Sequence, residues 1–273
     1  MNPALIISVY KNVKDLEVVL RSVEQQTHSD IQIIISEDGK SDEMHDFVSN
    51  YTGKLPLTHF TQEDIGWRKN RSLNFAIKNT PADYLIFIDG DCVLHPHFLE
   101  NHVNHAQPNR ILAGKRIKLG PMFSTQLRNT QSIDEFSKSI IKNYRAIKND
   151  HALFYEEGIY ISPNSFWSIL PNLRKMNQLK GCNFSCYKKA LDDINGFDED
   201  YQLPAIGEDI DLTWRFKGLN YQLYSVRNYA VQYHLHHKEN WLDQSENLKR
   251  MNTNIKEKRY VAANGISKRN GLI

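Results

Sequence analysis

The chain has 273 residues, 40% of them hydrophobic, and its 34 basic and 32 acidic residues give a net charge of +2. This length fits one domain with an elaborated second half, and the balanced charge argues against a general nucleic-acid-binding protein. Three cysteines are too few for a disulfide framework and lack a zinc-binding spacing. No signal peptide is recognised after Met1, and no apolar run approaches the roughly 20 residues of a spanning helix. We therefore expect a cytoplasmic protein.

The first half of the chain alternates short apolar runs with amphipathic helical patterns. Helical spacing of apolar residues follows the first and second runs, and a helix carrying Leu73 and Ile77 precedes the fourth. This alternation implies β-α-β crossovers and a mostly parallel sheet, an α/β fold in which ligands bind at the carboxyl ends of the strands. The predicted strands are Ala4–Val9, Ile31–Ile35, Leu55–Phe60 and Tyr84–Asp89.

The second half is less regular. A helix is predicted from Pro96 through Val103, a strand over Ile111–Leu119 and one long amphipathic helix over Ile133–Ile147. We divide the single domain into a first half (1–115), a second half (116–240) and a C-terminal helix and tail (241–273). Later predicted elements are a helix over Lys188–Ile194 and strands over Tyr221–Val226 and Ala230–Tyr233.

The run from Tyr84 to Asp91 organises the chain. Its apolar residues predict a strand buried on both faces, so the carboxylates of Asp89 and Asp91 should lie at the strand's open end. They stand two positions apart, and extended geometry would place them on one side. Gly90 between them lets another group approach the backbone closely. The pair indicates a site for Mg²⁺ or Mn²⁺, although a strand end followed by a turn also explains it.

Two further groups suggest a site. Glu208, Asp209 and Asp211 begin a predicted helix, where a carboxylate can act as a general base, although helix capping accounts for acids there as well. His234, His236 and His237 end a strand and could supply a metal ligand, but alternation would keep them from serving one ion together. The basic residues Arg68, Lys69 and Arg71 fall where a phosphate could sit or where a helix faces solvent.

Taken in order, these segments resemble the family 2 glycosyltransferases of the GT-A fold. The segments are Ile6–Asn12, Ser36–Asp42, Gly66–Asn74 and Asp89–Asp91. The later segments 181–185, 195–201, 207–211 and 234–237 are similar to the galactosyltransferase-type carboxyl-terminal region of β1,4-galactosyltransferases and bacterial chondroitin-polymerase-like enzymes. The resemblance covers most of residues 4–237, and it implies a nucleotide-sugar-binding half (1–115) and an acceptor and catalytic half (116–240). Two departures are Ser-Val-Tyr-Lys-Asn in the first strand and Glu37 in place of the common first Asp of the second motif.

The resemblance implies a role for each matching residue. Asp38 would bind the uracil of a UDP-sugar, with Ser8 and Tyr10 lining the base pocket and Arg71 close to the nucleotide. Asp89, Gly90 and Asp91 would form the DxD motif, with Asp91 on the metal and Asp89 near the ribose or metal. His234 would be a metal ligand, with His237 as the second choice. Asp209 would be the general base beside Glu208, and Asp211 and Asn183 would bind the acceptor.

The expected activity is therefore an inverting, metal-dependent transfer of a hexose or N-acetylhexosamine, with galactose favoured. The donor is a UDP-sugar, the acceptor a glycan or lipid-linked glycan, and the product a β-glycoside of a surface polysaccharide. The alternatives are a sugar-phosphate nucleotidyltransferase, for which the chain lacks a glycine-rich basic loop after the first strand, and a non-catalytic carbohydrate-binding or scaffold protein. Basic residues from Lys249 to Arg269 could touch the inner face of an anionic membrane, although a solvated tail is favoured.

Overall fold

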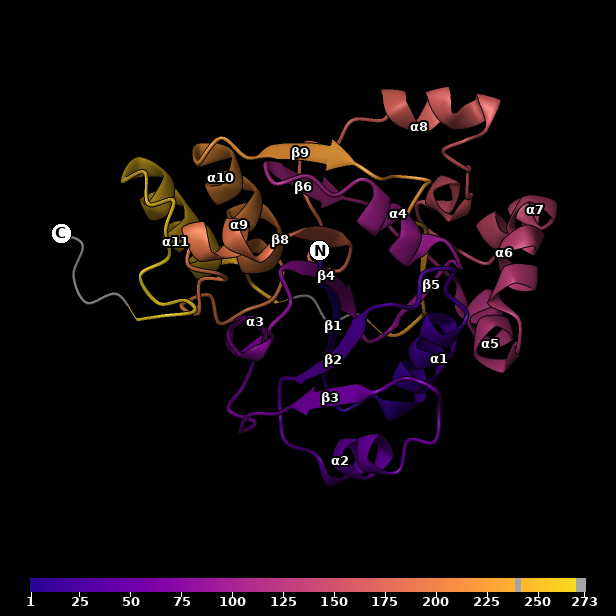
Figure 1. Ribbon diagram of the computed structural model, residues 1–273, viewed down its shortest axis with the longest axis horizontal. Coiled ribbons are helices and arrows are strands. Elements are labelled where there is room, and N and C mark those ends of the chain that lie inside the picture. The colour runs from indigo at the N-terminus through magenta and orange to yellow at the C-terminus, as the bar shows by residue number, and fades with distance from the viewer. Residues whose placement is uncertain (239–241, 269–273) are drawn as a thin grey trace.

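The computed structural model describes residues 1–238 and 242–268, and its centre is a seven-stranded sheet in the order β3-β2-β1-β4-β8-β6-β9 (Figure 1). The strands β1 to β4 are parallel, as the alternating sequence pattern predicts. The mostly parallel α/β sheet flanked by helices is therefore confirmed. The strands of this sheet are β1 (Pro3–Val9), β2 (Gln32–Glu37), β3 (Leu57–Phe60), β4 (Tyr84–Asp89), β6 (Arg110–Ala113), β8 (Phe184–Tyr187) and β9 (Gln222–Ser225).

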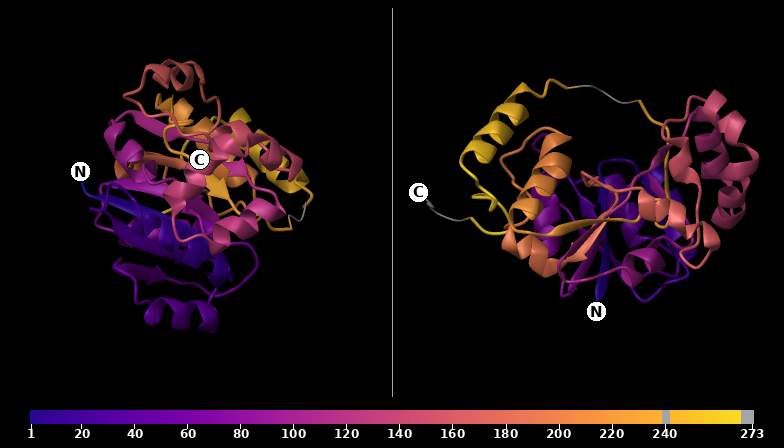
Figure 2. Two further views of the ribbon diagram at one scale, coloured as in Figure 1. Left: turned by 90° about the vertical axis from the view of Figure 1, so that its right-hand side faces the viewer. Right: turned by 90° about the horizontal axis from the view of Figure 1, so that it is seen from above.

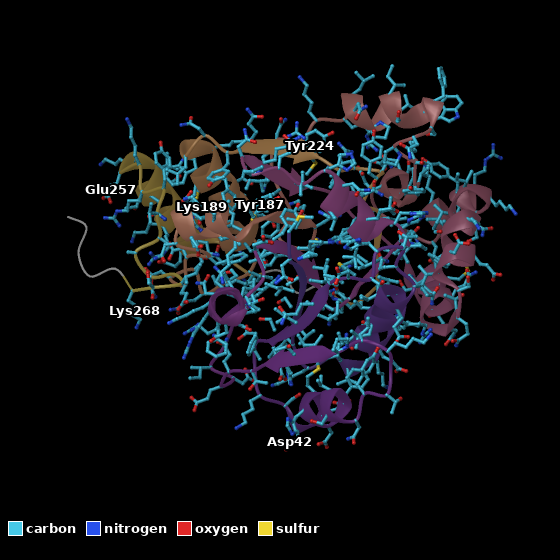
Figure 3. All side chains as sticks on the ribbon, viewed as in Figure 1. Asp42, Tyr187, Lys189, Tyr224, Glu257 and Lys268 are labelled. Carbon is cyan, nitrogen blue, oxygen red and sulfur yellow. The ribbon has the colours of Figure 1, made fainter. Side chains whose placement is uncertain are left out.

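Helices cover both faces of this sheet because successive residues of β1 point to opposite sides. Leu5 and Ile7 pack in one apolar cluster with Leu16 of α1, whereas Ile6 packs in a second cluster with Leu73 of α3. Many charged side chains lie at the outside, as Figure 3 shows for Asp42 and Glu257. The helices of the first half are α1 (Val13–Glu24), α2 (Asp42–Ser49), α3 (Lys69–Asn79) and α4 (Phe98–Asn104).

The second half departs from the sequence prediction in two places. The strand expected over 111–119 is broken into β6 and β7 (Ile117–Lys118), which belong to different sheets. The single helix expected over 133–147 is two helices, because Asn143 leaves helical geometry (φ −97°, ψ 13°) between α6 and α7. The helices of this half are α5 (Pro121–Asn129), α6 (Ile133–Lys142), α7 (Tyr144–Asn149), α8 (Ile169–Leu173), α9 (Lys188–Asp193), α10 (Asp211–Gly218) and α11 (Ser245–Lys256).

A small sheet and a π-helical turn complete the region around the strand ends. The small sheet has the order β5-β10-β7, with β5 (Cys92–Leu94) following β4 directly and β10 (Gln232–His234) pairing with it antiparallel. The π-helical turn Ile206–Ile210 leads into α10. Figure 2 shows α11 and the α5–α7 group on opposite sides of the molecule. Within the described ranges, no helix is both long and apolar enough to cross a membrane.

Candidate active site

A cavity of about 640 Å³ opens at the carboxyl ends of the parallel strands. The register of the sheet explains its position, because Ser8 of β1 pairs with Ser36 of β2 on one side and with Asp89 of β4 on the other. The residues that follow these strands therefore meet at one edge. The wall includes six residues predicted to bind donor or metal, namely Ser8, Tyr10, Asp38, Asp89, Gly90 and Asp91.

Asp38 is held rigidly beside the end of β2. One carboxylate oxygen accepts a hydrogen bond from Gln62 Nε2 at 2.7 Å, and the other accepts one from the backbone N–H of Arg68 at 2.8 Å. The side chain is almost fully buried but still borders the cavity. A carboxylate fixed in this way can accept a further hydrogen bond from a ligand N–H without first having to be ordered.

Lys69 lies between the two acidic clusters that the sequence places far apart. Its ammonium contacts Asp89 Oδ1 at 2.7 Å and Glu208 Oε2 at 2.5 Å. Burial alone would lower the pKa of Lys69, but the two carboxylates outweigh it and raise the pKa well above its ordinary value. The lysine therefore stays charged and connects the end of β4 to the π-helical turn.

Gly90 lies where β1 passes too close for a side chain. Its N–H donates to Ser8 O at 2.8 Å, and a Cβ at this position would lie 2.7 Å from Val9 Cγ1. The sequence predicts a close approach at this glycine. The structure shows that the approaching group is the first strand, which fixes the position of the neighbouring Asp89 and Asp91.

Asp91 meets two histidines from the other end of the chain. Its Oδ2 lies 3.4 Å from His234 Nε2 and 3.1 Å from His237 Nε2. Burial would raise the pKa of Asp91, but hydrogen bonds from His234 and His237 hold it well below its ordinary value. Strand alternation does not apply here because β10 ends at His234, so His237 rather than His236 shares the site. Strand geometry likewise stops at Asp89, because Gly90 and Asp91 lie in a turn, and Asp89 and Asp91 contact different partners.

The Asp91–His234–His237 group has the donor set of a transition-metal site. One ligand atom from each side chain lies within 4.8 Å of the others. A carboxylate with two imidazoles suits Mn²⁺ better than Mg²⁺, which prefers oxygen ligands. Asp89 is the weaker candidate ligand, because its carboxylate is bound to Lys69. These residues therefore fit a divalent cation. The sequence offered His234 or His237 as the ligand, and the structure places both beside Asp91.

Asp209, the predicted general base, lies behind Glu208. One of its oxygens accepts from Lys180 Nζ and the other from the backbone N–H of Gly181, both at 2.6 Å. Glu208 itself faces the cavity, and its Oε1 accepts from the N–H of Ala205 at 3.2 Å. The acidic pair therefore presents one carboxylate to the cavity and one to the segment before β8.

Three residues expected at the site lie elsewhere. Asp211 is fully buried, bound to Arg215 Nε at 2.6 Å and to Tyr201 OH at 3.2 Å, so it stabilises α10 instead of contacting an acceptor. Asn183 is also buried and donates to two backbone carbonyls. Arg71 is exposed and borders a different cavity beside α3. Sequence spacing could not distinguish these directions, which depend on tertiary packing.

Sequence reasoning missed the positive and sulfur-containing groups beneath the site. Arg116 is half-buried with its guanidinium against Cys182 Sγ, and its positive charge acts on Asp89 and Asp91. The Sγ atoms of Cys92 and Cys182 lie within 4.8 Å of each other and of an Asp89 carboxylate oxygen. Only Lys69 carried a signal, as part of a basic trio at the start of α3. Arg116 belongs to no recognisable motif.

The sequence profile described as "Glycosyl transferase family 2" matches residues 4–168. The chain belongs to this family. Among curated relatives it is 24% identical over 241 residues to the chondroitin synthase of Escherichia coli, covering 85% of the chain and 34% of that protein. It is 26% identical over 129 residues to the validoxylamine A glucosyltransferase of Streptomyces hygroscopicus subsp. jinggangensis, covering 46% of the chain and 30% of that protein. The chain thus spans about a third of the length of these relatives.

Solved structures share the fold. The mannosyltransferase PcManGT from Pyrobaculum calidifontis, in complex with GDP-Man and Mn²⁺, superimposes with a TM-score of 0.56 at 14% identity, covering 88% of the chain and 58% of that protein. S. aureus TarS 1-349 with UDP-GlcNAc gives 0.56 at 14% identity, covering 90% and 63% respectively. The expected GT-A architecture of this family 2 member is therefore confirmed.

Proposed function

We propose that this family 2 member transfers a hexose or N-acetylhexosamine from a UDP-sugar to a hydroxyl of a glycan, with inversion to a β-linkage. The observation that carries the proposal is that Asp38, Asp91 with its histidines, and Glu208 meet at one cavity. A nucleotide, a diphosphate and an acceptor hydroxyl need groups of these three kinds close together.

The relatives support the class of substrate. One is named a chondroitin synthase and another, from Pasteurella multocida, a hyaluronan synthase, and both names refer to polysaccharides built from sugar units. TarS is recorded with UDP-GlcNAc and with UDP. We infer a UDP-sugar donor, with galactose-type sugars favoured, and a role in surface polysaccharide synthesis on a glycan or lipid-linked acceptor.

The residues of the chain supply binding, orientation and proton transfer. Asp38 accepts a hydrogen bond from the uracil, and the backbone of Ser8 and Tyr10 lines the base pocket. Asp209, on the Gly181 side of Glu208, is the proposed base: it removes the proton of the acceptor hydroxyl while the hydroxyl oxygen bonds to the anomeric carbon. The bond from that carbon to the UDP oxygen breaks and UDP leaves with the electron pair. Glu208, on the cavity wall, orients the attacking hydroxyl, and Lys69 holds Glu208 in place.

Asp91, His234 and His237 would hold the divalent cation, which when bound offsets the negative charge of the departing diphosphate. Arg116 adds positive charge near Asp89 and Asp91, and Lys69 adds positive charge at Asp89. Mn²⁺ is the preferred ion, for the reason that two of the three ligands are imidazoles. The requirement for a metal is part of the proposal.

The first experiment measures UDP release from four donors separately: UDP-galactose, UDP-N-acetylgalactosamine, UDP-N-acetylglucosamine and UDP-glucose. Each is tested with Mn²⁺ and then with chelator, and wild type is compared with Asp91→Ala and Asp209→Asn. Manganese-dependent release from one donor, lost in both variants, supports the mechanism and identifies the sugar. UDP binding is measured in the same samples. Absence of both binding and release would overturn the proposal and leave a carbohydrate-binding or scaffold role.

A further inference from the structure

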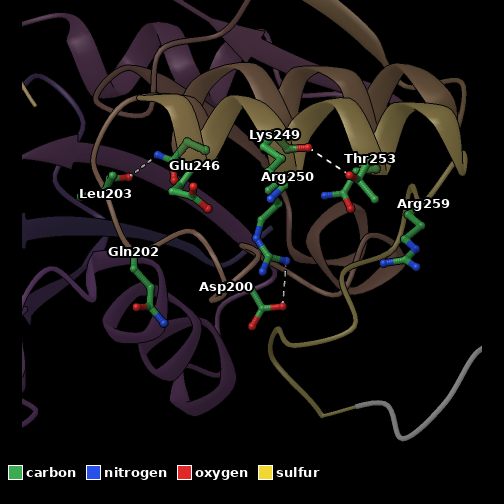
Figure 4. Close-up of a pocket in the computed structure, with 10 residues that line it drawn as sticks. Asp200, Gln202, Leu203, Glu246, Lys249, Arg250, Thr253 and Arg259 are labelled. Atoms are coloured by element: carbon green, nitrogen blue, oxygen red, sulfur yellow. Dashed lines mark hydrogen bonds and ion pairs between the residues drawn. The ribbon is translucent and has the colours of Figure 1, made fainter. Parts of the chain in front are cut away.

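A second concave surface, the α11 groove, lies beside the proposed catalytic cavity. It occupies about 720 Å³ between α11 and the chain segment 200–203, a volume typical of ligand sites. Figure 4 shows Lys249, Arg250 and Thr253 on α11 and Arg259 just beyond it, with Asp200 and Gln202 on the facing segment. Both walls are polar, as carbohydrate sites require, because sugar hydroxyls need donors and acceptors.

The groove and the catalytic cavity share one thin wall. Leu203 borders the groove and the next residue, Pro204, borders the cavity, with Glu208 a few residues further on. The wall is fixed to α11 because Asn247 Nδ2 donates to Leu203 O at 3.0 Å. A chain of sugars whose terminal hydroxyl lies at Glu208 can therefore extend over Pro204 into the groove.

The charges of the groove favour a negatively charged sugar. Lys249 makes no hydrogen bond or ion pair through its ammonium with any other described residue. Arg250 Nη1 lies 3.0 Å from Asp200, and Arg259 contacts Glu257, which leaves further N–H groups of both guanidinium ions available. Three cations and the two acids Asp200 and Glu246 line the groove, so its formal charge is positive. Arginine can bind a carboxylate or phosphate with two parallel hydrogen bonds.

A buried donor at the base of the groove has no partner. A small cavity of about 30 Å³ continues from the groove and shares Asp200, Arg250 and Arg259 with it. Arg215 lines this cavity, is 1% exposed, and its Nη2 has no hydrogen-bond partner among the described residues. Because an unpaired buried N–H is costly, it favours entry of one acceptor oxygen. Asp198 also lines this small cavity and would repel a full negative charge there. We therefore expect an anionic group to bind in the wider groove.

We propose that the α11 groove binds the acceptor glycan behind its reacting end, and that it selects chains carrying a negatively charged group, carboxylate or phosphate. This inference rests on the proposed transfer function, because it concerns the acceptor of that reaction. Asp200 and Glu246 accept hydrogen bonds from sugar hydroxyls, whereas Lys249, Arg250 and Arg259 bind the anionic group. A neutral chain of the same length therefore binds less tightly.

The test measures binding of three probes to the whole protein by calorimetry, without donor. The probes are a hexasaccharide of alternating glucuronate and N-acetylglucosamine, the same hexasaccharide with its carboxyl groups reduced to alcohols, and a glycerol-phosphate hexamer. We expect at least one anionic probe to bind about tenfold more tightly than the reduced one, and its affinity to fall with added salt. Preference for the first or third probe distinguishes carboxylate from phosphate. Equal affinity for all three, or no binding, would overturn the inference.

Lys249→Ala/Arg259→Ala is the decisive variant, because both side chains are exposed and neither borders the catalytic cavity. It should lose the preference for the anionic probe, while binding of the reduced probe stays unchanged. Lys14→Ala/Lys142→Ala removes the same charge from exposed positions on α1 and α6 and should keep the preference. If the Lys249→Ala/Arg259→Ala variant kept the preference for the anionic probe, the groove would not be the source of that preference.

UDP release and UDP binding are measured on the same samples. If wild type binds the anionic probe but not UDP, the groove stands and the transfer proposal fails. If UDP is released normally but charge has no effect on glycan binding, the transfer proposal stands and the groove inference fails. The thermal unfolding midpoint of each variant shows that the fold is intact.

Discussion

Replacing Asp209 by Asn tests which carboxylate of the Glu208-Asp209 pair acts as the base. The substitution removes a proton acceptor and keeps the shape of the side chain. The amide oxygen can still accept from the N–H of Gly181, but the amide N–H₂ cannot accept the hydrogen bond that Lys180 Nζ donates in the wild type. The substitution therefore changes the chemistry of one acceptor atom and leaves the size and shape of the side chain nearly unchanged.

Two magnitudes separate chemistry from stability. Loss of a general base lowers the rate about 10² to 10⁴-fold, roughly 3–5 kcal/mol in the barrier. Loss of the ion pair with Lys180 should cost at most about 1 kcal/mol of folding stability, because the Lys180 side chain is 38% exposed. The variant should then remain folded at temperatures at which wild type is assayed.

The assay is UDP release under saturating donor with Mn²⁺, alongside UDP affinity and thermal unfolding. We expect kcat to fall at least about a hundredfold with UDP affinity unchanged, because Asp209 does not border the donor cavity. Glu208→Gln is the matched comparison, since Glu208 does border it. A loss in kcat below tenfold for Asp209→Asn, together with a large loss for Glu208→Gln, would refute the assignment and make Glu208 the base.

Three further predictions concern the metal, the strand packing and acid stability. His237→Ala should raise the Mn²⁺ concentration needed for half-maximal UDP release by at least about tenfold, and an unchanged titration would exclude His237 as a ligand. Gly90→Ala should lower the free energy of unfolding by about 1–3 kcal/mol in urea titrations, because its Cβ would lie 2.7 Å from Val9 Cγ1; unchanged stability would show that β1 moves aside. Burial lowers the pKa of His102 to about 3, so the folded state binds fewer protons than the unfolded state and loses stability as pH falls from about 6.5 towards 3. His102→Gln should flatten this pH dependence by about 2–3 kcal/mol between pH 7 and 4.5, and equal slopes would contradict the shift.

Local patterns in the sequence determine the first half of the fold. The predicted strands Ala4–Val9, Ile31–Ile35 and Tyr84–Asp89 overlap β1, β2 and β4, because these runs are mainly apolar. The helices between them have clear apolar stripes, so a parallel sheet follows. The placement of Asp38, Asp89 and Asp91 at one cavity then follows from the rule that parallel strands end at one edge. Only secondary-structure periodicity and connection rules enter this reasoning, and both are local properties.

Tertiary structure decided the contacts between segments that are distant in the sequence. Lys69 joins Asp89 to Glu208. His237 contacts Asp91 only because β10 ends at His234, so strand alternation no longer directs the residues that follow. Asp211 has the same spacing as a site residue but faces inward, because Arg215 one helical turn later neutralises it. Periodicity fixes which residues share a face of an element. It does not fix which neighbour that face meets, and that is decided by the packing of the whole chain.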